Sequence, residues 1–205
     1  MTSHLRPAIV LIVLFTVLTG VALPLAMTGI GGAIFPFQAG GSLIEKDGKV
    51  IGSALIGQNF TSDKYFWSRP SAISGPDPND ASKTVPTPYD ASNSAASNLA
   101  PTSKALIDRV TDSVKTLKGS EGEAPIPADA VTTSASGLDP DISPENALRQ
   151  VARVAAARKL PEDKVRALVQ AQTAMPFLGF IGQPRVNVLR LNLALDSLAT
   201  ATPSS

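Results

Sequence analysis

The chain has 205 residues, of which 18 are basic and 17 acidic, with one histidine and no cysteine. The lack of cysteine excludes disulfide bonds and thiolate chemistry, and the lone His4 excludes a zinc site or a histidine-dependent catalytic site. A formal charge of +1 gives no electrostatic footprint for nucleic acid. Because no charged residue occurs between Arg6 and Glu45, this stretch is typical of a membrane segment.

The apolar core of that stretch runs from Ala8 to Ala26 and predicts a helix that crosses a membrane once. It would be about 28 Å long as a helix, against about 30 Å of bilayer hydrocarbon. A cleaved signal peptide is the alternative, although its apolar region is usually only about 7 to 15 residues long. Arg6 precedes the span and the next basic residue is Lys46. The positive-inside rule therefore predicts a cytoplasmic N-terminus and a main domain in the periplasm or outside the cell.

The expected architecture is a single N-terminal transmembrane helix followed by one α+β domain. Residues 1–28 form the cytoplasmic stub and the transmembrane helix, and residues 29–41 form a connector with too much glycine and proline to continue the helix. Residues 42–196 form the extracytoplasmic domain, with a β-hairpin, about three helices and a C-terminal strand. Residues 197–205 form a frayed tail.

A β-hairpin is predicted at the start of the domain, with strands at 43–46 and 49–51. Asp47-Gly48 lies between them, and this dipeptide accepts the positive φ angles of a type I′ turn. A two-residue loop would place Lys46 opposite Lys49 and Ile44 opposite Ile51.

An aromatic cluster with one arginine follows the hairpin, and it is either part of the core or an anchor for a protein partner. Core packing is favoured for Trp67 because a domain with few aromatic residues needs them in its core. Trp, Tyr and Arg also dominate interface hot spots, which favours the second interpretation. The cluster consists of Phe60, Tyr65, Phe66, Trp67 and Arg69.

Residues 71–103 are rich in proline and serine and predict a long loop, held by a few apolar residues or by a partner. A helix follows, capped by Thr102 or Ser103 and ended by Gly119 as the C′ residue. Residues 120–128 are expected to be a second linker.

The last third of the chain predicts two helices and a strand. Ser143 as N-cap and Pro144 at the first position start a helix, and Pro161 begins a second that packs against it as a hairpin. The alternation of residues 185–195, with Leu189 and Leu191 on one face, predicts a strand, although leucine-rich runs also occur in helices.

Catalytic motifs are missing from the sequence. There is no phosphate-binding P-loop and no G-x-S-x-G elbow, and no serine stands at a distinctive spacing from a lysine. Residues Asp139, Asp141, Ser143 and Glu145 alternate as in a calcium loop, but an EF-hand requires glycine and glutamate where this chain has Pro144 and Gln150. Turn and helix-capping chemistry explains these residues better, and Gln150 is expected on a solvated helix surface.

Within the predicted span, Thr16, Gly20 and Pro24 are four residues apart and form a stripe of small residues. Such a stripe allows another transmembrane helix to approach closely. Because the span contains no ionisable residue, it cannot move an ion by itself.

Five segments together resemble the C subunit of the Kdp potassium-transporting P-type ATPase, and the resemblance covers nearly the whole chain. The turn region before Asn98-Leu99 departs from the glycine-rich pattern of the family. The resembling segments are LRPA at 5–8, GSALIGQNF at 52–60, YFWSRPSA at 65–72, TSASGLDPDIS at 133–143 and QPRVNVLRLNLALD at 183–196.

This resemblance implies a complex with a potassium-channel-like A subunit, an ATP-hydrolysing B subunit and a small F subunit. It implies that ATP and potassium are handled by the complex, with no cofactor, metal or catalytic residue in this chain. The family is also described as a catalytic chaperone that raises the ATP affinity of the B subunit, with a glutamine matching Gln150 as the suggested nucleotide residue. The predicted topology would place Gln150 across the membrane from cytosolic ATP.

The expected function is that of an accessory, non-catalytic subunit of an ATP-driven potassium uptake complex. It would stabilise the assembly of the channel-like and ATP-hydrolysing subunits and cover the external side, where potassium enters. The alternatives are the catalytic chaperone and, more remotely, a membrane-anchored periplasmic hydrolase or binding module.

Overall fold

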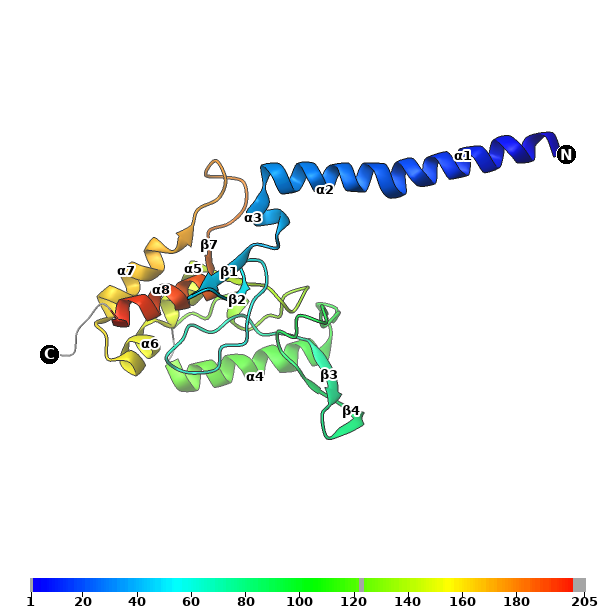
Figure 1. The fold of residues 1–205 in the computed structure, drawn as a ribbon. Coiled ribbons are helices and arrows are strands. Elements are labelled where there is room, and N and C mark those ends of the chain that lie inside the picture. The colour runs from blue at the N-terminus through cyan, green and yellow to red at the C-terminus, as the bar shows by residue number, and fades with distance from the viewer. Residues whose placement is uncertain (1, 122–123, 201–205) are drawn as a thin grey trace. The chain divides into compact units, whose positions relative to one another are not determined.

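The computed structural model describes residues 2–121 and 124–200 (Figure 1). The chain forms two compact units, Met1–Ser53 and Ala54–Ser205. The first contains a long apolar helix and a β-hairpin, and the second a mixed helix and strand domain. The α+β fold with one N-terminal candidate membrane helix is confirmed.

The long helix runs from Leu5 to Ile34, and by length and composition it can cross a membrane. It extends past the predicted end, so the expectation that the glycines of residues 29–41 would stop it is wrong. Each glycine costs a helix only about 1 kcal/mol relative to alanine. The helix ends where Pro36 disfavours a helical conformation at Phe35, which has φ −129°. Its segments are α1 (Leu5–Val17), the π-helical turn η2 (Leu18–Ala22) and α2 (Leu23–Ile34), followed by α3 (Pro36–Ala39).

The π-helical turn lies just before Pro24, which has no backbone N–H to donate to the preceding turn. Leu23 N donates to Leu18 O, the five-residue spacing of a π turn. Nearby hydroxyl groups also bond to the backbone: Thr19 Oγ1 donates to Phe15 O at 2.6 Å and Thr28 Oγ1 to Pro24 O at 2.8 Å. These bonds satisfy polar groups inside the helix, as a membrane requires.

The hairpin consists of β1 (Leu43–Lys46) and β2 (Lys49–Ser53). Asp47 and Gly48 have φ values of 53° and 73°, which confirms the predicted type I′ turn, and Lys46 pairs with Lys49 as expected. The predicted pairing of Ile44 with Ile51 is wrong, because Ile44 lies opposite Gly52. A bulge beside Glu45 shifts the register by one residue, which hydrophobic alternation alone does not reveal.

The core of the second unit is built from short helices packed around a small antiparallel sheet of order β5-β7-β6. Phe66, Leu191 and Leu195 are fully buried in it. Its elements are β5 (Asp141–Ile142), α5 (Pro144–Arg149), α6 (Val151–Arg158), α7 (Glu162–Ala171), β6 (Thr173–Ala174), β7 (Arg185–Asn187) and α8 (Val188–Thr200).

The two helices predicted around Ser143 and Pro161 are confirmed. The Ser143 side chain accepts a hydrogen bond from Asn146 N, and Pro144 occupies the first turn. The first helix is interrupted at Gln150, which separates α5 from α6. Lys159, with φ 56°, ends α6, and α7 then packs against α6 as a hairpin.

The predicted strand at residues 185–195 is wrong beyond its first residues, because β7 ends at Asn187 and α8 begins at Val188. Val188, Leu191, Asn192 and Leu195 are buried, a spacing that follows the period of a helix. Leucine and alanine are strong helix formers, so propensity and burial agree. Helix α8 also continues into the predicted tail of 197–205, whose last five residues, 201–205, lie outside the described part of the chain.

The expectation of a loop throughout residues 71–103 is wrong in part, because the segment contains a second hairpin of β3 (Ser74–Asp77) and β4 (Asp80–Pro86). Ile73, 1% exposed, holds its start against the domain. Helix α4 (Lys104–Glu121) follows as predicted but passes through Gly119. An added Cβ at Gly119 would meet nothing within 4 Å, so no contact there requires the helix to end.

Residues 120–128, predicted as a linker, contain the end of α4. Residues 122–123 lie outside the described part, and the 3-10 turn η3 (Ala128–Ala130) closes the segment.

Candidate functional site

The small residues of the predicted stripe lie on the surface of the long helix. Thr16, Gly20 and Pro24 are all exposed, and an added Cβ at Gly20 would meet nothing within 4 Å in this chain. The stripe is therefore free to contact another helix or lipid.

The aromatic cluster is divided between the core and the surface of the second unit. Phe66 is fully buried, while Tyr65, Trp67 and Arg69 are half-buried. The rings of Phe60 and Tyr65 lie 5.6 Å apart and tilted, and Phe60 packs partly against the core. The cluster thus places Phe66 in the core and leaves Tyr65, Trp67 and Arg69 partly exposed at the surface.

Phe66 and Trp67 lie outside the helices and strands, and two buried amide side chains bond to their backbone. Asn192 accepts from Phe66 N at 2.8 Å and donates to Phe66 O at 3.0 Å. Gln150 pairs with Trp67 in the same way, at 2.8 and 3.2 Å. Each amide therefore provides the donor and acceptor that buried backbone requires.

The side-chain amide of Gln150 has no hydrogen-bonding capacity left for a ligand. In addition to Trp67, it accepts from Arg153 Nη2 at 2.7 Å and donates to Asn146 Oδ1 at 3.2 Å. Two acceptor and two donor positions are the full capacity of a glutamine side chain. The side chain is only 1% exposed, which differs from the solvated position expected from the sequence.

Arg153 connects the Gln150 amide to the aromatic cluster. Its guanidinium lies 3.7 Å from the centre of the Trp67 ring, and Nη1 donates to Asp63 O at 2.9 Å and to Tyr65 O at 3.1 Å. Burial lowers the pKa of Arg153 to about 10, which leaves it charged at neutral pH. The arginine therefore fixes the segment before Trp67 through charge-assisted bonds and a cation–π contact.

Gln150 is also among the residues that line a cleft of about 390 Å³. Trp67, Arg69, Tyr89 and Arg149 are among the residues that line the cleft. Tyr89 donates its hydroxyl to Arg69 O at 2.8 Å, and burial raises the Tyr89 pKa to about 12. The hydroxyl therefore stays protonated at neutral pH and holds the cleft wall rather than acting as a base.

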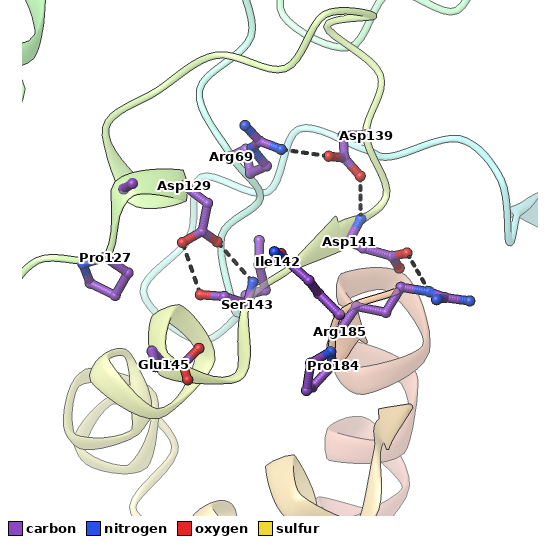
Figure 2. A pocket seen from close by; sticks show the side chains of 12 residues that line it. Arg69, Pro127, Asp129, Asp139, Asp141, Ile142, Ser143, Glu145, Pro184 and Arg185 are labelled. Atoms are coloured by element: carbon purple, nitrogen blue, oxygen red, sulfur yellow. Dashed lines mark hydrogen bonds and ion pairs between the residues drawn. The ribbon is translucent and has the colours of Figure 1, made fainter. Parts of the chain in front are cut away.

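A second cleft, of about 670 Å³, is lined by acidic residues of the predicted turn (Figure 2). Each of its three aspartates has a partner in the chain. Asp139 pairs with Arg69 at 2.8 Å and Asp141 with Arg185 at 3.1 Å, while Asp129 accepts from the Ser143 N–H and hydroxyl, both at 2.8 Å (Figure 2). Burial raises the pKa of Asp141.

These contacts agree with the capping and turn role assigned to Asp139, Asp141 and Ser143. Within 2–121 and 124–200, no group of three or more metal-ligating side chains is found.

Comparisons with known proteins identify the family. A family model described as "K+-transporting ATPase, c chain" (KdpC) matches residues 5–197. The potassium-transporting ATPase KdpC subunit of Methylobacterium nodulans is 62% identical, over 97% of this chain and 99% of that protein. Those of Rhodopseudomonas palustris and Bradyrhizobium diazoefficiens are 64% and 62% identical, over 96% and 97% of this chain and 99% of each relative. This chain belongs to the KdpC family.

Membership in the KdpC family makes the chain a membrane-associated subunit of a potassium-transporting ATPase. The one candidate membrane helix among residues 2–121 and 124–200 agrees with this. Three residues that hold the Trp67 and Gln150 region together carry no functional-site motif in the sequence: Asn146, Arg153 and Asn192. A polar Asn192 inside a leucine-rich run is the one local signal that could have pointed to a buried hydrogen-bonding role.

Gly57 belongs to the segment 52–60 and lies directly against the ring of Tyr89. An added Cβ would lie 2.5 Å from Tyr89 Cε1 and 2.6 Å from Asp139 O. We expect Gly57→Ala to lower the free energy of unfolding by about 1–3 kcal/mol, because the backbone must shift to relieve the overlap. Urea unfolding of the full chain in detergent measures this change.

The matched control is Gly119→Ala, where an added Cβ meets nothing within 4 Å. It is expected to raise the free energy of unfolding by about 0.5–1 kcal/mol, the usual gain for alanine in a helix. Equal effects of the two substitutions would show that the contact at Gly57 does not limit packing.

Proposed function

We propose that this chain is an accessory, non-catalytic subunit that stabilises the assembly of the transporter and covers the external side where potassium enters. Its partners would be the channel-like A subunit, the ATP-hydrolysing B subunit and the small F subunit. ATP and potassium would be handled by those subunits. The observation that carries the proposal is the complete use of the Gln150 amide inside the protein.

A direct nucleotide contact would require Gln150 to break bonds that hold the Trp67 segment. Its 1% exposure leaves no polar edge to offer. This supports a role in folding for the residue that the family description associates with ATP. A chaperone effect on ATP affinity would then act through contact between subunits rather than through a shared nucleotide site.

The proposed orientation has the N-terminus in the cytoplasm and the folded domain in the periplasm or outside. It rests on Arg6, the basic residue before the span. Ala81 is exposed on β4, and the chain has no native cysteine. In cells with a permeable outer membrane, labelling of Ala81→Cys by an impermeant thiol reagent supports this orientation. Labelling only after lysis of the inner membrane contradicts it.

Assembly is expected to depend on the stripe of Thr16, Gly20 and Pro24. We expect Gly20→Leu to reduce co-purification of the chain with the ATPase in mild detergent, because the added bulk prevents close helix approach. The matched control is Ala22→Leu, roughly opposite on the helix and also exposed. Both variants become more hydrophobic, so membrane insertion should be unchanged.

Unchanged co-purification of Gly20→Leu would show that this face is turned to lipid. Purification of the unmodified chain as a lone protein, with no ATPase, would contradict the accessory function itself and favour the binding module or hydrolase.

A further inference from the structure

The connection between β6 and β7 carries a group of exposed apolar side chains, which we call the apolar loop (175–181). Figure 1 shows it in orange, running out past the strands that hold it. Its large side chains are 52–76% exposed. Soluble surfaces rarely gather so many apolar side chains in one short segment unless a partner covers them. They are Met175, Phe177, Leu178, Phe180 and Ile181.

The backbone of the apolar loop closes on itself. Phe177 N donates to Ile181 O at 3.1 Å, and Ile181 N donates to Phe177 O at 2.9 Å. Gly179 N and Phe180 N also donate within the loop, at 3.0 and 3.4 Å. Gly179 has a φ of 81°, which this tight turn requires. Four N–H groups of the loop are thus bonded internally, which lowers the cost of moving this backbone from water to hydrocarbon.

Charge is distributed as an interfacial segment requires. No residue from Thr173 to Pro184 is charged. Arg185 follows at the base, where its side chain is 59% exposed beside Asp141. An apolar loop above a polar base that carries an exposed, ion-paired arginine is compatible with a position at the boundary between acyl chains and phosphate headgroups.

The strand at the base of the apolar loop contacts the start of the second unit. Asn187, at the end of β7, donates its Nδ2 to Ala54 O at 3.0 Å. Ala54 is the first residue of the second unit and directly follows the unit that carries the apolar span. The strand that holds the loop therefore lies beside the first residue of the second unit.

We propose that the apolar loop inserts into the lipid bilayer interface and gives the domain a second membrane contact. Lipid is favoured over a protein partner because the loop offers side chains without charge and a backbone in which four N–H groups are already bonded internally. The contact would restrict the orientation of the domain on the membrane in addition to the transmembrane anchor.

Fluorescence quenching in the full chain tests this proposal. Single-cysteine variants are straightforward because the chain has no native cysteine. Phe180→Cys at the tip, Gln183→Cys at the base and Ala81→Cys on β4 would each carry an environment-sensitive fluorophore. The labelled chain alone would be reconstituted into vesicles of phosphatidylethanolamine and phosphatidylglycerol containing lipids brominated on their acyl chains.

We expect the label at position 180 to be quenched at least about twofold more than the label at position 81, with position 183 between them, because only the loop tip reaches the acyl chains. Quenching at 180 no greater than at 81 would overturn the proposal. If the fluorescence of the label at position 180 changes only after the other transporter subunits are added, the proposal would be overturned in favour of a protein partner. The test uses this chain alone, so its result is independent of the proposed role in assembly.

A charged residue introduced into the apolar loop provides a second test of the same contact. With the label on Leu178→Cys, an additional Phe180→Glu should abolish the quenching, whereas Phe180→Leu should retain it. Phe180 is 76% exposed, so neither change disturbs the folded core. Equal quenching in the two variants would contradict insertion.

Discussion

Replacement of Gln150 by leucine is expected to lower the free energy of unfolding by about 2–6 kcal/mol, because two buried backbone groups of Trp67 would each lose a partner at about 1–3 kcal/mol. Leucine has a similar volume, so the loss reports hydrogen bonding rather than a cavity. Arg153 would also lose an acceptor at 2.7 Å. Urea unfolding of the full chain in detergent, followed by tryptophan fluorescence, measures the change, and Trp67 is the only tryptophan.

The control is Gln170→Leu, an exposed position on α7, where the free energy of unfolding should change by no more than about 0.5 kcal/mol. A separate measurement of ATP affinity in the assembled transporter distinguishes the two roles suggested for Gln150. A Gln150→Leu variant as stable as Gln170→Leu, yet with reduced ATP affinity of the complex, would contradict the structural role and favour a nucleotide contact.

Phe66→Ala is expected to lower the free energy of unfolding by about 3–5 kcal/mol, the usual cost of emptying a buried aromatic site. Phe66 has 0% exposure and lies in the core with residues of α6, α7 and α8. Since small domains are stable by only about 5–15 kcal/mol, this loss should also lower the yield of folded protein.

Phe177→Ala removes the same atoms from the apolar loop, where the side chain is 69% exposed. Its free energy of unfolding should stay within about 0.5 kcal/mol of the unmodified chain. A comparable loss in both variants would mean that the loop packs on the domain, and it would also remove the basis for membrane contact. The two variants therefore compare an aromatic side chain in the core with an exposed one in the apolar loop.

The contacts of Gln150, Arg153 and Asn192 connect three of the segments that resemble the Kdp C subunit, at or next to 65–72, 133–143 and 183–196. Trp67 and Phe66 belong to one motif and Asn192 to another, and Gln150 follows a third. Their hydrogen bonds hold these segments together. A substitution in one of these segments should therefore lower the free energy of unfolding of the chain, and weaker assembly with the other subunits should follow from that loss.

Local features of the chain were determined by the sequence itself. The absence of charge after Arg6 specified the apolar helix, Asp47-Gly48 specified the turn, and Ser143-Pro144 specified the start of α5. Each depends on the solvation or backbone preferences of neighbouring residues, which do not require knowledge of the rest of the fold.

Tertiary structure decided the features that depend on distant partners. The run after Arg185 alternates like a strand, yet packing of Leu191 and Leu195 into the core makes it helix α8. Gln150 reads as a surface residue until Trp67, 83 positions earlier, is placed against its amide. The apolar residues at 175–181 are compatible with a core position by composition, but the fold leaves them exposed. In each case a short segment is compatible with two environments, and only long-range burial selects between them.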